Sequence, residues 1–279
     1  MIRLFSKTWV NDYPWLKLAI KSVLKLSTEV VDWTIVGDAG SKHDIEAVVL
    51  QGVQESKGAL RYKIVDVPEH WPEALAIGNG YLAQQWVKMN AHRVMGDDLF
   101  WNWDSDVIAT KPFSSKTFLG GSGKPVYWIS QFNSIMNGAD RPAHESRIEL
   151  LKTIFGLNSI PKDYMGSEVT FEYMRCMPIP LYGGLLRQCA ERAEWKRSFD
   201  ILKSGDHRFS EFNVIGRAFH VLFPEAFEWR NAEAQAPTWS GGYVEGGVGS
   251  GCFQEHAYVT QFWSWSGVTK QAEDFVNSL

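Results

Sequence analysis

In the first 113 residues, short apolar runs alternate with segments in which apolar residues recur at helical spacing. The apolar runs have the length of strands, and the periodic segments have the length of helices. Strand, helix, strand, strand, helix, strand is the order typical of an open, mostly parallel sheet. We therefore predict an α/β fold with a mostly parallel sheet flanked by helices. The expected strands are 2–6, 32–40, 61–68 and 99–103, and the expected helices are 11–27 and 81–96.

Acidic residues stand where two of these strands end. Asp38 closes the second strand, and Asp104 and Asp106 close the fourth. Ligands of parallel α/β sheets bind outside the C-terminal ends of the strands. Residues i and i+2 of an extended segment face the same way, so we expect Asp104 and Asp106 to converge on one point. Two converging carboxylates suit Mg²⁺ or Mn²⁺ holding a diphosphate leaving group. The competing interpretation is a turn with solvated acids.

Composition narrows the classes of function. The formal net charge is −4, from 28 Lys and Arg against 32 Asp and Glu, which argues against binding through bulk attraction to a phosphate backbone. A local basic groove stays possible. The 13 Trp supply either a Trp-rich core or stacking platforms, and we favour the core. Three Cys without C-x-x-C spacing predict no disulfide framework or zinc site. No apolar run has transmembrane length and the N-terminus has no signal-peptide pattern, so we expect a cytoplasmic protein.

The second half has weaker periodicity. Ser146 and Glu149 form a capping-box pattern that predicts a helix ending at Gly156. Further helices are expected over 183–205, over 211–223 with Ser210 as cap, and over 269–279, and the Gly-rich stretch 240–253 is typical of an active-site loop. No linker or repeat interrupts the chain. We predict one domain, 1–279.

The segment 104–113, DSDVIATKPF, resembles the D-x-D region of GT-A glycosyltransferases, in which an apolar stretch and a Pro-Phe pair follow the acids. Upstream, residues 80–94 are similar to the helix that precedes this motif in several small bacterial and phage members. Gln84, Gln85 and Lys88 occupy the positions of their Q-Q-x-x-K pattern.

Two downstream blocks extend the resemblance over most of the chain. Residues 209–219, FSEFNVIGRAF, resemble the family's S-E-x-x-x-x-G segment, and residues 255–267 are similar to its closing W-S-W-x-G region. The resemblance implies a GT-A, Rossmann-like fold with a nucleotide-sugar-binding half (1–113) and an acceptor-binding half (114–279). It implies metal-dependent transfer of a hexose or pentose from a nucleotide sugar to a hydroxyl acceptor, in the cytoplasm of a bacterium or a phage-infected host. A UDP-sugar is the favoured donor, because it is frequent in the resembling families.

The resemblance also implies roles for individual residues. Asp104, Asp106 and His256 would hold Mn²⁺ or Mg²⁺, with Asp106 the stronger ligand, and Lys88 would balance diphosphate charge. The expected nucleotide-sugar contacts are Phe5, Lys7, Asp38, Lys88, Asp104 and Ser105. For His256 the competing interpretation is an ordinary surface or core histidine, and for Lys88 it is a solvated helix face.

Glu211, at a predicted helix N-terminus, is the candidate general base. The helix dipole stabilises a carboxylate there and lowers its pKa, so a base role requires compensating burial. The competing interpretation is an acid that serves only the helix. Asp206 and His207 are the alternatives. A general base of this kind is required for transfer with inversion and not for transfer with retention. No acceptor signature is present in 114–205.

Two other classes of function compete. A sugar-phosphate nucleotidyltransferase would carry an early Gly-rich G-x-G-T-R loop, which this N-terminus lacks. A non-catalytic carbohydrate-binding protein would use the Trp residues as platforms, but would not need the Asp pair. The acceptor is either a glycan or lipid-linked sugar, or a hydroxymethylated pyrimidine of phage DNA. The DNA acceptor requires a basic groove, which Lys111, Lys116, Lys124, Arg192 and Lys196 would supply.

Overall fold

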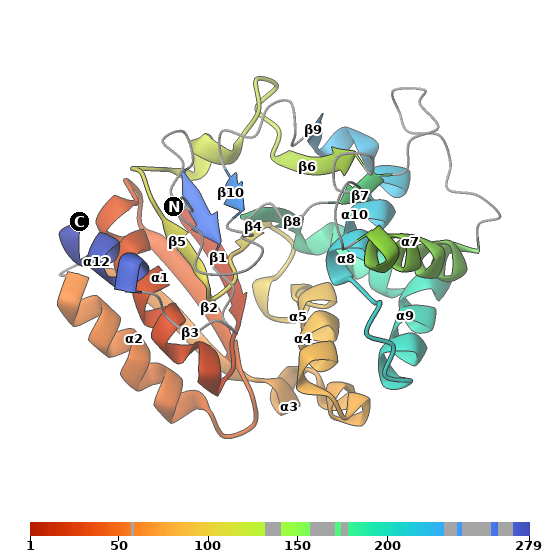
Figure 1. Cartoon of the computed structure of the whole chain (residues 1–279), viewed down its shortest axis with the longest axis horizontal. Helices are drawn as coiled ribbons and strands as arrows, with labels where there is room; N and C mark the ends of the chain where they lie inside the picture. The colour runs from red at the N-terminus through yellow and green to blue at the C-terminus, as the bar shows by residue number, and fades with distance from the viewer. Residues whose placement is uncertain are drawn as a thin grey trace.

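A five-stranded sheet forms the centre of the molecule in the order β3-β2-β1-β4-β8 (Figure 1). This computed structural model describes residues 1–56, 59–131, 141–156, 171–173, 178–231, 239–241, 258–261 and 270–279. In this sheet β1, β2, β3 and β4 are parallel to one another, and β8 runs antiparallel to β4. The predicted α/β class with a mostly parallel sheet is confirmed. The strands are β1 (Ile2–Lys7), β2 (Val31–Gly37), β3 (Leu60–Asp66), β4 (Leu99–Asn102) and β8 (Ile179–Tyr182).

The parallel strands are apolar almost throughout because helices cover the sheet. Val31 and the run from Trp33 to Val36 of β2 are buried. Helices α1 (Tyr13–Leu26) and α2 (Lys42–Ser56) pack side by side over β1–β3 (Figure 1). The helical spacing predicted for the first helix is confirmed, with Ala19, Ile20 and Val23 turned into the core. The C-terminal helix α12 (Lys270–Ser278), also predicted, packs against α1.

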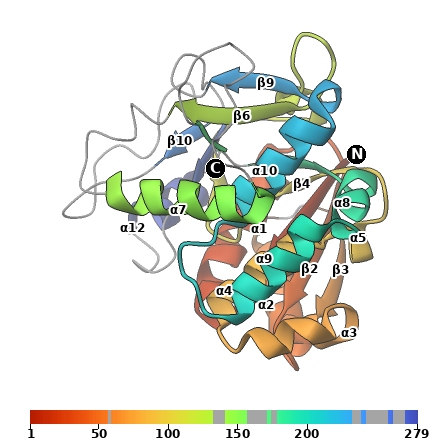
Figure 2. The ribbon, with the colours of Figure 1, turned by 90° about the vertical axis from the view of Figure 1, so that its right-hand side faces the viewer.

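Two small sheets flank the central one. β5 (Val107–Ala109) follows β4 but leaves the central sheet and pairs antiparallel with β11 (Val259–Gln261). β11 in turn pairs parallel with β10 (Trp239–Gly241). The other small sheet has β6 (Val126–Gln131) between an antiparallel and a parallel neighbour (Figure 2). These neighbours are β7 (Phe171–Tyr173) and β9 (Glu228–Asn231).

Two helices that the sequence predicts as continuous are broken. The segment predicted over 81–96 consists of α4 (Gly80–Met89) and α5 (His92–Met95). At the break, the Asn90 carbonyl accepts hydrogen bonds from Trp71 Nε1 and from the Arg93 N–H, each 3.1 Å away, so it makes an i+3 bond in place of the α-helical i+4 bond. The helix predicted over 183–205 consists of α8 (Gly183–Ala190) and α9 (Ala193–Lys203), because Arg192 has extended backbone angles.

The prediction of where α7 begins was wrong. α7 spans Arg141–Phe155, so Ser146 lies inside it and does not cap its start. The predicted end is confirmed, since Gly156 follows with a φ of 64°, a left-handed conformation that favours glycine. α10 (Glu211–Leu222) begins after Ser210, as predicted, although the Ser210 side chain makes no capping hydrogen bond. The short helices are α3 (Val67–His70), η1 (Val10–Asp12), η2 (Pro72–Ile77), η3 (Ser115–Phe118) and η4 (Pro224–Ala226).

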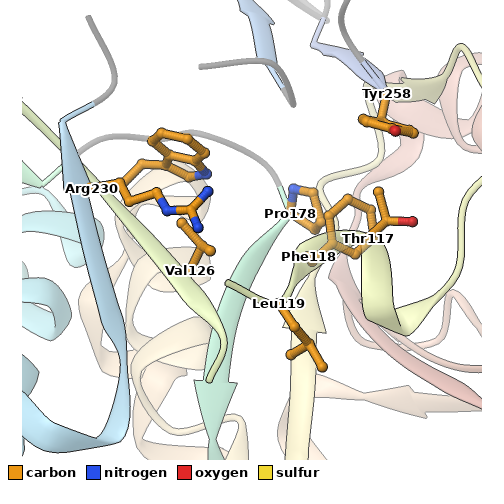
Figure 3. Close-up of a pocket in the computed structure, with 8 residues that line it drawn as sticks. Thr117, Phe118, Leu119, Val126, Pro178, Arg230 and Tyr258 are labelled. Atoms are coloured by element: carbon orange, nitrogen blue, oxygen red, sulfur yellow. The ribbon is translucent and has the colours of Figure 1, made fainter. Parts of the chain in front are cut away.

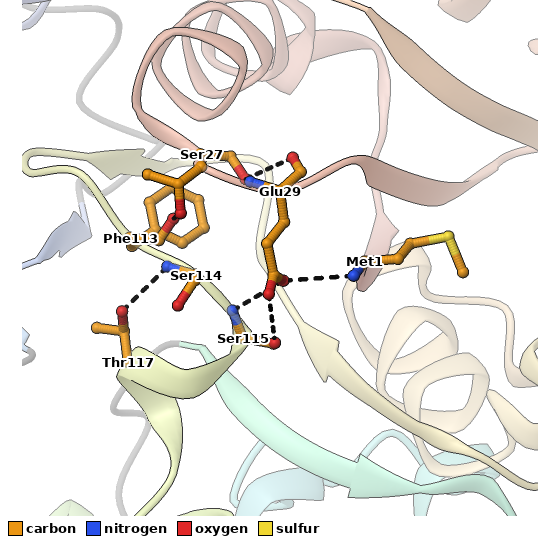
Figure 4. A network of polar contacts seen from close by, with 8 residues as sticks. Met1, Ser27, Glu29, Phe113, Ser114, Ser115 and Thr117 are labelled. Carbon is orange, nitrogen blue, oxygen red and sulfur yellow. Dashed lines mark hydrogen bonds and ion pairs between the residues drawn. The ribbon is translucent and has the colours of Figure 1, made fainter.

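A polar network ties the chain after β5 back to the end of α1 (Figure 4). The Glu29 carboxylate accepts hydrogen bonds from the backbone N–H and the hydroxyl of Ser115, at 3.1 and 3.0 Å, and lies 3.6 Å from the Met1 ammonium. These contacts lower the pKa of Glu29 although burial opposes them. The segment that leaves the D-x-D region is therefore anchored at its far end.

Most of the described Trp residues are core residues, as predicted. Trp15, Trp33, Trp71, Trp103 and Trp195 have at most 1% of their surface exposed. Trp103 packs edge to face on Trp33 and stacks with Phe113, which fixes the strand that leads to the acidic turn. In the part of the chain that the structure describes, every helix is too short or too polar to cross a bilayer.

Candidate active site

Three strands bring charged residues to the same edge of the central sheet. β1 ends at Lys7, β2 is followed by Asp38, and β4 is followed by Asp104. Because β1 pairs in parallel with both β2 and β4, the C-terminal ends of the three strands lie next to one another. Lys7 Nζ contacts Asp38 Oδ1 at 2.7 Å and donates to the carbonyl of Thr8 at 2.6 Å. The Lys7–Asp38 pair therefore bridges the ends of two strands.

Lys88 joins the D-x-D segment to a helix of the second half. Its Nζ lies 2.8 Å from Asp104 Oδ1 and 3.2 Å from Glu211 Oε1. The Lys88 and Glu211 side chains are each 6% exposed, and that of Asp104 is 15% exposed. Asn102 Nδ2 donates to the same Asp104 oxygen at 3.1 Å. Three residues predicted from the resemblance are thus in direct contact in a nearly dry environment.

The local sequence explains how Lys88 and Glu211 come to face each other. Asn79 caps the start of α4 by accepting a hydrogen bond from the Leu82 N–H at 3.2 Å. One turn before Lys88, Gln85 Oε1 accepts from the backbone N–H of Glu211 at 3.1 Å. The Lys88 ammonium also lies 4.8 Å from the centre of the Phe212 ring. α4 therefore holds the first turn of α10 by both backbone and side chain.

The two lysines of the site have opposite pKa shifts. Burial lowers the pKa of Lys7 more than Asp38 and Asp12 raise it, and Lys88 adds to the lowering. Burial also acts to lower the pKa of Lys88, but Asp104 and Glu211 together outweigh it and raise the pKa above its ordinary value. Lys88 is therefore a permanent cation of the site.

The prediction that Asp104 and Asp106 lie on an extended segment was wrong. Ser105 and Asp106 form a turn, closed by a 3.1 Å hydrogen bond from the Val107 N–H to the Asp104 carbonyl. The turn is needed because β4 belongs to the central sheet and β5 to a different one. Of the competing interpretation, the turn is confirmed, but its solvated acids are not, since Asp106 is only 9% exposed.

Sequence reasoning missed Asp12. The sequence suggests it as the cap of the first helix, but its side chain makes no cap hydrogen bond. Instead Asp12 Oδ2 accepts a hydrogen bond from Ser105 Oγ at 3.1 Å, and both residues are buried. Asp12 follows the first strand by five residues, and an acid this close to a strand end was the available signal.

Three other predicted site residues lie elsewhere. Phe5 is fully buried with its ring against Phe100, so its side chain has a packing role and no surface for a nucleotide. Asp206 is held by Arg208, with 3.0 Å and 2.9 Å hydrogen bonds from the Arg208 backbone N–H and Nε. This pairing lowers the pKa of Asp206. His207 stacks on Tyr81, with ring centres 6.5 Å apart.

Of the three predicted metal ligands, Asp104 and Asp106 lie among the described residues. His256 lies outside the described residues, so its role stays a prediction. Among the described residues no group of three His, Cys, Asp or Glu is arranged to hold a metal ion. The register of β11 against β5 places Gln261 opposite Val107, the residue that follows Asp106.

A pocket of about 260 Å³ lies beside the candidate site, where the three sheets meet (Figure 3). Phe118 of its wall packs on Trp101 and Trp103, the latter directly before Asp104. Pro178 precedes β8 and Tyr258 precedes β11. The lining residues are Thr117, Phe118, Leu119, Val126, Trp128, Pro178, Arg230 and Tyr258.

Comparison with known proteins identifies the fold. No protein family profile matches the sequence, and no curated protein matches it either. The galactosyltransferase LgtC in complex with donor and acceptor sugar analogs matches over 100% of this chain and 96% of its own, with a TM-score of 0.54 and 13% identity. An active-site mutant of LgtC matches over 98% and 94%, with the same TM-score and identity. This chain has the GT-A fold. Mouse xyloside xylosyltransferase 1 matches over 86% and 87%, with a TM-score of 0.47 and 11% identity.

Proposed function

We propose that this chain is a glycosyltransferase that takes a sugar from a nucleotide-sugar donor, with a UDP-sugar as the favoured donor. The observation that carries the proposal is the buried contact of Lys88 with Asp104 and Glu211 at the C-terminal edge of a GT-A sheet. Ligands of such sheets bind at this edge. A carbohydrate-binding protein or a nucleotidyltransferase has no comparable observation in its favour.

The charges of the site suit a divalent cation. Asp12, Asp38, Asp104, Asp106 and Glu211 are five carboxylates, and Lys7 and Lys88 are the two ammonium groups that neutralise part of them. A diphosphate would add further negative charge to this excess. Oxygen ligands of this kind suit Mg²⁺ or Mn²⁺, and Asp104 and Asp106 are the residues that would hold it. When bound, such an ion stabilises the charge of a departing diphosphate.

Glu211 is the proposed general base for a transfer with inversion. Its carboxylate is buried, and Lys88 and Gln85 fix its position. A base held in this way is oriented to take the proton of an acceptor hydroxyl as the new bond forms. Asp206 is a weaker candidate, because its bonds to Arg208 lower its pKa and occupy both of its oxygens.

The acceptor is a hydroxyl group of a glycan or of a modified DNA base. Two of the five cations proposed to line a DNA groove are engaged in surface ion pairs, Lys124 with Glu225 and Arg192 with Glu194. These pairs reduce the positive charge that a nucleic acid would meet, and they favour the glycan.

The experiment that tests the proposal measures sugar transfer and donor hydrolysis across a panel of nucleotide sugars, before and after chelation with EDTA. We expect activity to stop in EDTA and to return with Mn²⁺ or Mg²⁺. Asp106→Asn is expected to cost more activity than Asp104→Asn, because it removes the stronger of the two charged ligands. Full activity after chelation would remove the metal from the proposal, and no activity with any donor would remove glycosyl transfer.

A further inference from the structure

Arg217 is a buried arginine for which the described part of the chain supplies no partner. It lies on α10, six residues after Glu211, and is 8% exposed. Its Nε is fully buried and donates no hydrogen bond, and no carboxylate contacts its guanidinium in the residues that the structure describes. Other arginines are paired: Arg93 lies 2.7 Å from Glu73, and Arg3 lies 3.2 Å from Asp98.

Burial of the Arg217 guanidinium without a described partner is energetically unfavourable in the protein without ligand. A guanidinium keeps its charge at any physiological pH, so Arg217 cannot escape burial by losing a proton. Taking an ion out of water is strongly unfavourable unless an opposite charge and hydrogen bonds compensate. Lys88, which is equally buried, has two carboxylates for this purpose. Arg217 has five N–H donors in a planar fork, which matches the geometry of a carboxylate or a phosphate.

We propose that Arg217 binds an anionic group, a carboxylate or a phosphate, carried by the acceptor. The inference rests on the proposed function, since it assigns the acceptor to the same helix as Glu211. Six residues of helix correspond to a rise of about 9 Å and a rotation of about 240°, so Glu211 and Arg217 leave α10 on different faces. Helical side chains point back toward the N-terminus, so the Arg217 guanidinium reaches toward the turn that carries Asn213 and Glu211. Such spacing suits a group about one sugar ring away from the reacting hydroxyl.

The position of α10 supports a role in binding. The helix contacts α4 on one side and β7 on another, and Figure 2 shows it beneath the sheet of β6 and β9. Its first turn forms part of the candidate active site, and Asn213, one turn before Arg217, is also buried. An acceptor that reaches Glu211 therefore lies next to a helix whose buried arginine has no carboxylate partner among the described residues.

The binding test uses the full chain without donor. Calorimetry measures the binding of glucuronate, glucose 6-phosphate and neutral glucose to the wild type and to Arg217→Met. We expect the variant to bind whichever anionic sugar the wild type prefers at least tenfold more weakly, with glucose unaffected. The matched control Arg187→Met removes an exposed arginine that is already paired with Asp97, and it is expected to change none of these affinities. Equal affinities of wild type and Arg217→Met, or no binding of either anion to the wild type, would overturn the proposal.

A stability measurement separates binding from a structural role. In anion-free buffer Arg217→Met is expected to raise Tm, because it replaces a buried charge that has no carboxylate partner in the described part of the chain with an apolar side chain of similar length. A lower Tm would overturn the proposal, since it would mean that the folded protein already satisfies the guanidinium. Arg217→Lys keeps the charge without the fork and is expected to retain only part of the anion affinity. Binding of UDP with Mn²⁺, measured on the same proteins, tests the proposed function separately, because neither Arg217 variant is expected to alter it.

Discussion

Lys88 supplies the positive charge that partly neutralises Asp104 and Glu211 at the centre of the candidate site. It contacts both Asp104 of the D-x-D segment and Glu211 of α10, and it does so through a single nearly buried ammonium group. Removing one partner from a buried ion pair costs more than the pair contributes, because the remaining charge is left in a poorly solvated place. The stability of the fold and the geometry of the site therefore depend on the same side chain.

Lys88→Met is expected to lower the free energy of unfolding by about 3–5 kcal/mol, because it leaves Asp104 and Glu211 without their cation. Chemical denaturation measures the change. The control is Lys42→Met, which breaks an exposed ion pair with Glu69 and is expected to cost about 0–1 kcal/mol. Equal effects of the two substitutions would show that the buried contacts of Lys88 contribute little.

Glu211→Gln tests the proposed base. Gln keeps an oxygen for Lys88 but cannot take a proton, so we expect turnover to fall by roughly 10²–10⁴-fold with donor affinity nearly unchanged. Steady-state kinetics with a product anomer assignment checks this. A parallel loss of donor affinity would place Glu211 in the donor site or in the fold. Retention of the anomer would exclude the base role even if the variant is inactive.

Single residues of the site were predictable only where a pattern marks them. Lys88, Asp104 and Glu211 stand in sequence blocks that resemble a known family, and the structure brings them together. Asp12 has no such block, and its position five residues after a strand resembles a helix cap equally well. Phe5 was assigned to the ligand from its place near a strand end, although its ring points into the core.

At the scale of elements, the junction of α8 with the start of β4 depends on glycine. The backbone N–H groups of Gly183 and Gly184 donate to the carbonyls of Asp98 and Asp97, at 3.2 and 3.0 Å. A Cβ on Gly183 would overlap the carbonyl oxygen of Gly96, whereas a Cβ on Gly184 would lie 3.6 Å from Asp97 Cβ, at ordinary contact distance. Gly183 is therefore required by the close approach of the Gly96 carbonyl, whereas the position of Gly184 has room for a Cβ.

Gly183→Ala is expected to destabilise the protein by about 1–3 kcal/mol, the usual cost of overpacking. Gly184→Ala is the matched control and is expected to be neutral or stabilising by up to about 1 kcal/mol, since Ala loses less entropy than Gly in a helix. Denaturation midpoints of the two variants provide the comparison. A neutral Gly183→Ala would mean that α8 can move away from Gly96 without cost.

The junction of β9 with the loop before β6 should respond to acid. The Ser122 hydroxyl and N–H, and then Arg230, lower the pKa of Glu228 from 4.5 to about 2. A lowered pKa gives stability that is present above pH 4.5 and is lost as the pH falls toward 2. The stability difference between wild type and Glu228→Gln is therefore expected to shrink between pH 5 and pH 3. Glu225→Gln, at a side chain that is 94% exposed, should show no such trend; a constant difference for Glu228 would contradict the assignment.

The elements themselves were predicted best where both ends carry a local signal. The four parallel strands of the central sheet and α1, α10 and α12 follow from apolar spacing and from caps or glycines at their ends, whereas β8 was not predicted. The helix breaks at Asn90 and Arg192 do not follow from such signals, because they depend on tertiary hydrogen bonds and on backbone angles that helix propensity does not specify. For the same reason the turn at Ser105 and Asp106 was only the competing interpretation. The chain bends there because β5 pairs with β11, which lies about 150 residues later in the sequence.

At the scale of the whole molecule, donor binding should stabilise the fold. The proposed site draws on β1, β2, β4, α4 and α10, so a nucleotide there would link elements from both halves of the chain. With UDP and Mn²⁺ at a hundredfold excess over Kd, mass action predicts about 2.7 kcal/mol of added stability. Thermal unfolding with a series of nucleoside diphosphates measures it. No shift with any of them would count against a nucleotide-sugar enzyme.

The pairing of β5 with β11 has a consequence for synthesis on the ribosome. Val107–Ala109 emerge about 150 residues before Val259–Gln261, the strand that holds them. At the usual 5–20 residues per second, this separation corresponds to about 8–30 s of translation. During that interval the first four strands can assemble, but the acidic turn still lacks its outer support. The nascent chain is thus expected to form its parallel sheet early, and to gain the support of its acidic turn only after Val259–Gln261 have emerged.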